Sequence, residues 1–131
     1  MPVSYTKNMQ KHYVLCRMLG EGTMDEVFDY IHNLEVDDDF NEPFYEIVDF
    51  TEVKALDFGY YESNRLLGKY KVLALNKGYL GTIFVTGNVY GQAISKMFKT
   101  AGHFKGINIR VVQRLDEAVL LIDHLVNNPQ A

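Results

Sequence analysis

The sequence predicts an α/β domain with a single open, mixed but largely parallel sheet of about five strands, an N-terminal hairpin and about four packed helices. Two strand-like segments open the chain with a short turn between them, which is typical of a hairpin. From there on, apolar runs alternate with segments whose apolar residues recur at helical spacing. Such alternation is typical of a parallel sheet covered by helices. The glycine-bounded run GTIFVTG (Gly81 to Gly87) has the character of a buried central strand.

The opening hairpin is predicted from Val3 to Asn8 and from Lys11 to Leu19. The second segment is apolar on both faces except at Arg17, so we place it inside the sheet. We expect GEGT (Gly20 to Thr23) to end this strand. Thr23 and Glu26 form the T-x-x-E pattern of a capping box, which indicates a helix start. Apolar residues at helical spacing follow it: Met24, Val27, Phe28, Ile31 and Leu34.

The middle of the chain is harder to interpret. Phe44 to Phe50 is predicted as the next strand, followed by a linker and a helix for which Asp57 is the cap. Beyond it, Lys69 to Leu75 alternates as a strand would, yet its apolar residues also keep helical spacing, and Gly78 suits a helix end. We favour the helix, because another strand would leave two neighbouring strands without a covering layer.

The last third contains two more helices and one more strand. Asn88 is predicted to cap a helix that Gly102 closes. A strand from Ile107 to Val112 and a helix from Leu115 to Val126 complete the chain.

Size and charge restrict the classes of function. A chain of 131 residues fits one domain, spanning 1–131. Its formal charge of −4, with no run of Lys or Arg, argues against a nucleic-acid binder and against attraction to anionic lipid. The first residues have no apolar signal core, and no stretch approaches the length of a membrane span, so we expect a cytoplasmic protein.

The sequence contains no recognisable catalytic, metal or cofactor motif, and we expect a non-enzyme. Cys16 lies in an apolar run and is interpreted as a buried hydrophobe. The run Asp37 to Asp39 lacks a calcium-loop pattern and is interpreted as a solvated turn. The four histidines form no ligand motif, and no G-x-S-x-G turn surrounds Ser63 or Ser95.

Asp49 and Asp57 could form a catalytic carboxylate pair, but a strand end and a helix cap explain them more simply. The stretch TGNVYG (Thr86 to Gly91) leaves a central strand and opens a helix, whose free N–H groups can hold an anion. It lacks the full glycine spacing and the lysine of nucleotide-binding loops, so an ordinary turn is favoured.

Both stretches come after strands of the predicted parallel sheet, so we expect them at the same edge. Aromatic side chains at such an edge suit a protein partner, although helix packing explains them as well. The candidate interaction or ligand residues are Thr51, Asp57, Phe58, Tyr60, Tyr61, Asn88, Tyr90 and Gly91.

Several stretches together resemble the STAS superfamily, which includes anti-sigma-factor antagonists, and especially its bacterial STAS or SEC14-like branch. They are the opening hairpin, YEIVDFTEV, ALDFGYYESNRLLGKY, FVTGNVYGQAISKMFKTAG and IRVVQRLDEAVLLIDHL, the last of which matches the family's "EA" helix at Glu117 and Ala118. The resemblance implies a sheet of four or five strands and a non-enzymatic, regulatory role in protein interaction. It also implies a serine, phosphorylated by a partner kinase, at the start of the helix after the predicted strand.

The chain departs from the family at that serine. If Asp57 matches the preceding aspartate, Phe58 and Gly59 stand where the serine is expected, and neither accepts phosphate. We therefore expect an interaction module without the usual switch, with Thr51 and Ser63 left as the nearby hydroxyls. The partner is an unidentified protein, with a homodimer as one form. The alternative is a binder of a small apolar or anionic ligand held between the sheet and the helix after Asp57.

Overall fold

The computed structural model describes residues 3–40, 42–57, 60–87 and 89–128. They form five strands and four α-helices, with one short 3₁₀ turn, η1. The strands are β1 (Val3–Asn8), β2 (Tyr13–Thr23), β3 (Phe44–Asp57), β4 (Tyr79–Val85) and β5 (Ile109–Val112). The helices are η1 (Met9–Lys11), α1 (Met24–Val36), α2 (Tyr60–Lys77), α3 (Val89–Lys105) and α4 (Leu115–Asn127).

The strands form one sheet in the order β1-β2-β3-β4-β5. β1 pairs antiparallel with β2, and the other three pairings are parallel. The predicted α/β class, with an N-terminal hairpin and a mixed, largely parallel sheet, is confirmed.

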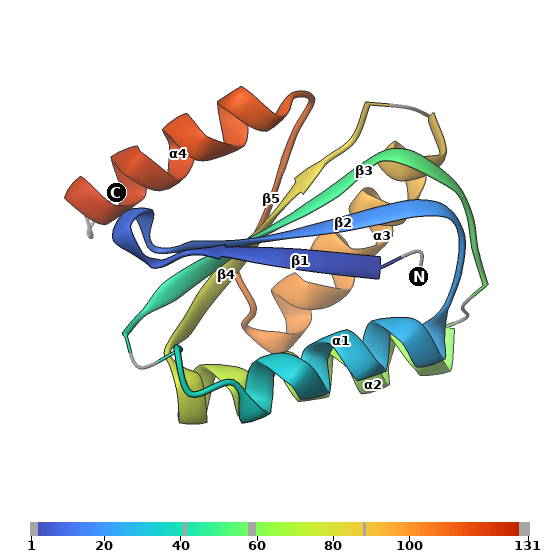
Figure 1. The fold of residues 1–131 in the computed structure, drawn as a ribbon. Helices are drawn as coiled ribbons and strands as arrows, with labels where there is room; N and C mark the ends of the chain where they lie inside the picture. Colours follow the sequence, from blue (N-terminus) through green and yellow to red (C-terminus); the bar gives the residue numbers. More distant parts are fainter. Residues whose placement is uncertain (1–2, 41, 58–59, 88, 129–131) are drawn as a thin grey trace.

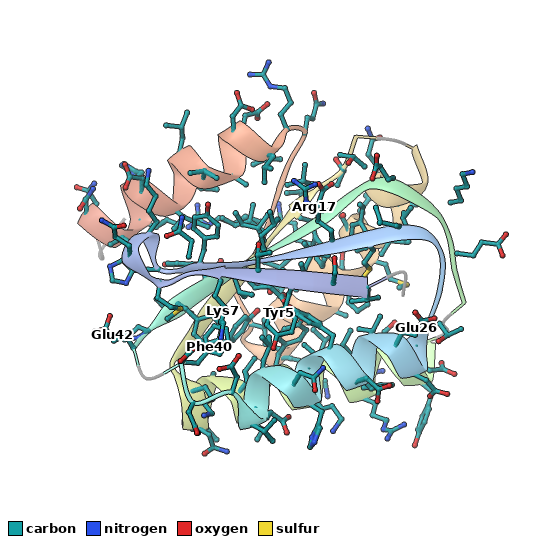
Figure 2. The ribbon with its side chains drawn as sticks, viewed as in Figure 1. Tyr5, Lys7, Arg17, Glu26, Phe40 and Glu42 are labelled. Atoms are coloured by element: carbon teal, nitrogen blue, oxygen red, sulfur yellow. The ribbon has the colours of Figure 1, made fainter. Side chains whose placement is uncertain are left out.

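Helices cover the two faces of the sheet unequally, as Figure 1 shows. On one face, α2 packs between α1 and α3, and these helices share the larger apolar core with β2, β3 and β4. On the other face, α4 packs over Ile47, Ile83 and Val85 through Ala118 and Ile122. Side chains alternate between these faces along each strand, so Arg17 lies on the α4 side and Tyr5 and Lys7 on the α1 side (Figure 2).

The ambiguous segment around Lys69 is part of α2, so the helix that we favoured there is confirmed. Gly78 follows the helix directly, with φ of +76°, a left-handed conformation that glycine adopts without strain. A Cβ on Gly78 would also make a tight contact, 3.1 Å from Cα of Pro43. The turn from α2 into β4 therefore depends on glycine.

Several predicted ends are wrong. The helix α3 continues through Gly102, which we expected to close it, to Lys105, and two strands extend well beyond their predicted ends. β2 continues through GEGT to Thr23, and β3 continues past Phe50 to Asp57, so the linker that we expected is part of a strand. The pairing of β3 with β4 ends at Asp49, whereas its pairing with β2 extends to Asp57. The two strands thus project beyond their neighbours as a two-stranded parallel ribbon, residues 19–23 and 52–57.

The ribbon bends because its ladder is irregular at two places. The register shifts between Arg17 and Leu19, where β3 has one extra residue, and again between Gly20 and Glu21. Gly20 has φ of +64°. Bulges of this kind bend strands and increase their twist. Figure 1 shows β2 and β3 curving together around one end of the sheet to reach α1 and α2.

The start of α1 agrees with its predicted cap. Thr23 Oγ1 accepts a hydrogen bond from the backbone N–H of Glu26 at 3.3 Å, which satisfies a donor of the first turn. No helix among the described residues is long and apolar enough to cross a membrane.

Candidate functional site

The candidate site lies at the carboxyl edge of the parallel strands, where the ribbon bends. Of the predicted site residues, Phe58 and Asn88 lie outside the described residues, and so does Gly59, which with Phe58 stands where the family's serine was expected. Asp57 is the last residue of β3, Tyr60 belongs to α2 and Tyr90 belongs to α3. The structure describes the backbone of these three residues but not their side chains. Thr51, Tyr61 and Gly91 are described in full.

Thr51 lies at the bulge of β3 and is hydrogen-bonded to Asp49. Asp49 Oδ1 accepts hydrogen bonds from the backbone N–H of Thr51 at 2.9 Å and from its hydroxyl at 2.7 Å. The side chain of Asp49 thereby satisfies a backbone donor at the point where the ladder is irregular. The predicted strand end is in fact this bulge, and Asp49 holds it rather than ending the strand.

The structure brings Thr51 together with the turn after β4. A Cβ placed on Gly87 would lie 2.8 Å from Cγ2 of Thr51, so the two backbones approach closely. Thr86 donates from its backbone N–H to the carbonyl of Val112 at 3.0 Å, which fixes the end of β4 against β5. The ends of β3, β4 and β5 thus meet at one edge, as expected for parallel strands.

Exposed apolar side chains occur at this edge. Tyr61, at the start of α2, has 74% of its surface exposed, and Leu19, on the ribbon, has 42% exposed. Thr51 and Glu52 are exposed as well, whereas Gly91 is buried and contributes packing for α3 rather than surface. Leu19 was not among the predicted residues, because we expected its strand to end there.

The two hydroxyls near the missing switch serine differ in access. Ser63 is buried within α2, with 2% of its surface exposed. Thr51 is exposed, but a phosphate on it would stand beside the carboxylate of Asp49 and would be repelled.

A second polar cluster, which sequence reasoning missed, lies inside the core around Glu46 of β3. Glu46 is fully buried. Its carboxylate accepts hydrogen bonds from the hydroxyls of Tyr30 at 2.5 Å, Tyr70 at 2.8 Å and Thr82 at 2.7 Å. The hydroxyl of Tyr79 lies 2.5 Å from that of Thr82 and, since the Thr82 proton goes to Glu46, acts as the donor. A single carboxylate therefore connects α1, α2, β3 and β4.

Burial controls the protonation of this cluster. Removal from water raises the pKa of Glu46, and the hydrogen bonds from Tyr30, Thr82 and Tyr70 act in the opposite direction. Burial, and after it the charge of Glu46, raises the pKa of Tyr30, of Tyr70 and of Cys16. Cys16 is buried, as predicted, and its raised pKa disfavours the reactive thiolate. The cluster is enclosed, so we interpret it as structural.

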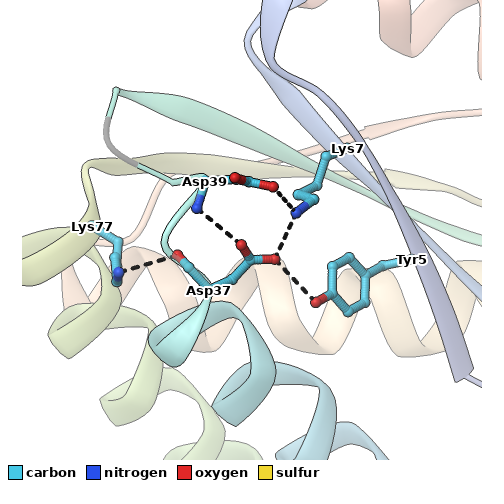
Figure 3. A network of polar contacts seen from close by, with 5 residues as sticks. All are labelled: Tyr5, Lys7, Asp37, Asp39 and Lys77. Atoms are coloured by element: carbon cyan, nitrogen blue, oxygen red, sulfur yellow. Dashed lines mark hydrogen bonds and ion pairs between the residues drawn. The ribbon is translucent and has the colours of Figure 1, made fainter.

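The expected solvated turn at Asp37 to Asp39 is part of a third polar network, shown in Figure 3. Lys7 Nζ contacts Asp37 at 2.8 Å and Asp39 at 2.5 Å, and Tyr5 donates to Asp37 at 3.3 Å. Lys77 donates to the backbone carbonyl of Asp37 at 3.2 Å. The hydrogen bond that Asp37 accepts from Lys7 lowers the pKa of Asp37. These contacts fasten the edge strand β1 and the end of α2 to the turn after α1.

Comparison with known proteins shows the fold. The structure is similar to the crystal structure of an uncharacterized protein from the DUF3478 family with a SpoIIAA-like fold, from Shewanella loihica PV-4. The match has a TM-score of 0.55 and 11% sequence identity, and it covers 92% of this chain and 91% of that chain. No family model matches the sequence. No curated protein matches it either. The SpoIIAA-like, or STAS, fold that the sequence resemblance implied is therefore confirmed.

Proposed function

We propose that this chain is a non-catalytic, STAS-like protein-interaction module that binds its partner at the carboxyl edge of the sheet. The observation that carries the proposal is that this end of the sheet exposes an apolar side chain on each face: Leu19 of the bent β2–β3 ribbon, on the same face as Arg17, and Tyr61 at the start of α2, on the other. Aromatic and aliphatic anchors among polar neighbours are the usual composition of a protein-binding surface.

The placement of the ionisable groups supports a non-catalytic role. Among the described residues, hydroxyl and carboxyl groups converge around Glu46, whose side chain is fully buried. A catalytic acid or base must reach the substrate's proton. Glu46 would have to leave the core to do so. Asp49, which lies at the edge, uses its carboxylate to hold the bulge.

We propose further that phosphorylation of a serine does not control this module. The nearby serine, Ser63, is buried in α2 and is closed to a kinase unless the helix opens.

The alternative, a ligand held between the sheet and α2, has little room. The apolar cavity there, lined by Phe50, Leu67 and Phe84 among others, has a volume of about 20 Å³. That is space for about one water molecule, far less than an acyl chain requires.

The test is affinity purification from the native host with paired variants. We expect Tyr61→Ala together with Leu19→Ser to reduce the captured partner severalfold, because both anchors are lost. Leu120→Ala is the matched control, since Leu120, in the middle of α4, is 68% exposed and is not part of the proposed surface. Equal recovery with all variants would contradict the assignment of the surface. A dimer retained by the double variant in light scattering would exclude this edge as the homodimer contact.

A further inference from the structure

An open groove lies at the opposite, amino edge of the sheet. It runs between the second half of α2, the start of β4 and the loop from α3 to β5, and its volume is about 440 Å³. This volume is within the range of small-molecule sites. Its walls include Lys71, Leu75, Tyr79, Leu80, Ile107 and Asn108. We propose that this groove binds a small organic anion with an apolar body, such as a medium-chain carboxylate.

The inner wall of the groove is aromatic. Tyr70 and Tyr79 both line it, with their ring centroids 5.0 Å apart. Their hydroxyls are turned inward, that of Tyr70 to Glu46 and that of Tyr79 to Thr82. The hydrogen bonds that fix these hydroxyls leave the rings to face a ligand. The apolar rim is open to solvent, with Leu75 86% exposed and Leu80 43% exposed.

The charge of the segments that line the groove favours an anion. Between Glu62 and Asp116 the sequence has nine lysines and arginines and no aspartate or glutamate. The remaining segments contain all 17 acidic residues and four basic ones, so the net charge of −4 conceals a strongly basic part. All residues that line the groove come from this basic part. A ligand there meets no carboxylate of the wall, and Lys71 is the one charged side chain among the lining residues.

Two polar groups in the groove are available to hold the anionic end. Across the part of the chain that the structure describes, the ammonium of Lys71 has no ion pair and the side-chain amide of Asn108 has no hydrogen bond. Other cations of α2 are engaged. Arg65 lies 4.5 Å from the ring centroid of Phe28, and Lys77 donates to Asp37. A cation beside an amide donor suits a carboxylate, and the tyrosine rings suit its hydrocarbon part.

The site is tested by NMR titration of the ¹⁵N-labelled chain with octanoate and, in parallel, with octan-1-ol. These probes share the hydrocarbon part and differ in the charged group. We expect octanoate to shift the amide signals of Leu75, Leu80, Gly106 and Asn108 saturably, and octanol to bind more weakly. With octanoate, we expect intermolecular nuclear Overhauser effects between the methylene protons of the probe and the ring protons of Tyr79.

Variants separate a specific site from general attraction to the basic part. Lys71→Gln should weaken octanoate binding about two- to fivefold, the range for an exposed ion pair, while octanol binding stays unchanged. Lys99→Gln is the control, since Lys99 is an exposed cation of α3 that does not line the groove. Equal binding of the two probes, an equal effect of both variants, or shifts that do not saturate would each overturn the proposal. The spectrum of each variant reports whether it is folded.

Discussion

Glu46 links the sheet to the helices that cover one of its faces. It accepts hydrogen bonds from Tyr30 of α1, Tyr70 of α2 and Thr82 of β4. Buried carboxylates are tolerated when their oxygens are satisfied in this way. In FYEIVDF the charged residue Glu46 stands between apolar neighbours, and that was the available signal. Sequence reasoning passed over it because the donors are 16, 24 and 36 positions away.

The pH dependence of stability tests the state of Glu46. Because its pKa is raised in the folded protein above the ordinary value of 4.5, folding favours the neutral acid. This contribution to stability is fully present below the unfolded pKa and is lost as the pH rises through the folded pKa. We therefore expect the free energy of unfolding of the wild type, relative to Glu46→Gln, to fall as the pH rises, measured by urea unfolding between about pH 4 and pH 8.

The difference in free energy of unfolding between the wild type and Glu46→Gln cancels the contributions of the other titrating groups, including Asp37. The pKa of Asp37 is lowered, so its effect has the opposite sign and is lost as the pH falls. A difference that stays constant over the whole range would show that Glu46 does not titrate with a raised pKa.

At the scale of elements, the sequence predicted the strands and helices well and their ends less well. Thr23 caps α1 and Gly78 ends α2, as predicted, because caps and left-handed turns are local chemistry. The extension of β2 and β3 depends on pairing between residues more than 30 positions apart, such as Gly20 with Val53. Gly20 and Asp49 suggested that their strands end there. In the structure, β2 and β3 stay paired past both residues, and the irregular positions are bulges.

Two glycines near α2 provide a matched pair of substitutions. Gly78→Ala should destabilise the protein by about 1–3 kcal/mol, because a left-handed residue gains a Cβ and that Cβ meets Pro43. Gly68→Ala, inside the same helix, should stabilise it by about 1 kcal/mol, since a Cβ there meets nothing within 4 Å. Urea unfolding measures both. A loss of stability at Gly68, or none at Gly78, would contradict the described path of α2.

For the whole molecule, the order of strands and helices along the chain was enough to predict the architecture. The sites could not be predicted in the same way, because they combine residues that are distant in the sequence. An opening hairpin followed by alternating strands and helices predicts the observed mixed sheet. The meeting of Thr51 with Gly87 follows from parallel strands ending at one edge. The groove could not be predicted in this way, because net charge and local motifs do not show that Lys71 and Asn108, 37 positions apart, share one wall.

The molecule therefore has two distinct surfaces at opposite ends of the sheet. The carboxyl edge carries the bulge, the ribbon and Tyr61, and it is the proposed protein-binding surface. The amino edge carries the groove in the basic part of the chain. Because they are separate, Lys71→Gln and Tyr61→Ala should act independently on ligand and partner.

The central claim is that a protein partner docks at the carboxyl edge, and site-specific photo-crosslinking in the native host tests it most directly. A photoreactive phenylalanine analogue replaces Tyr61 in one chain and Leu120 in another, positions that are 74% and 68% exposed. We predict a discrete crosslinked species with the probe at position 61 and none with the probe at position 120. The same products from both positions, or no product at position 61, would contradict the claim.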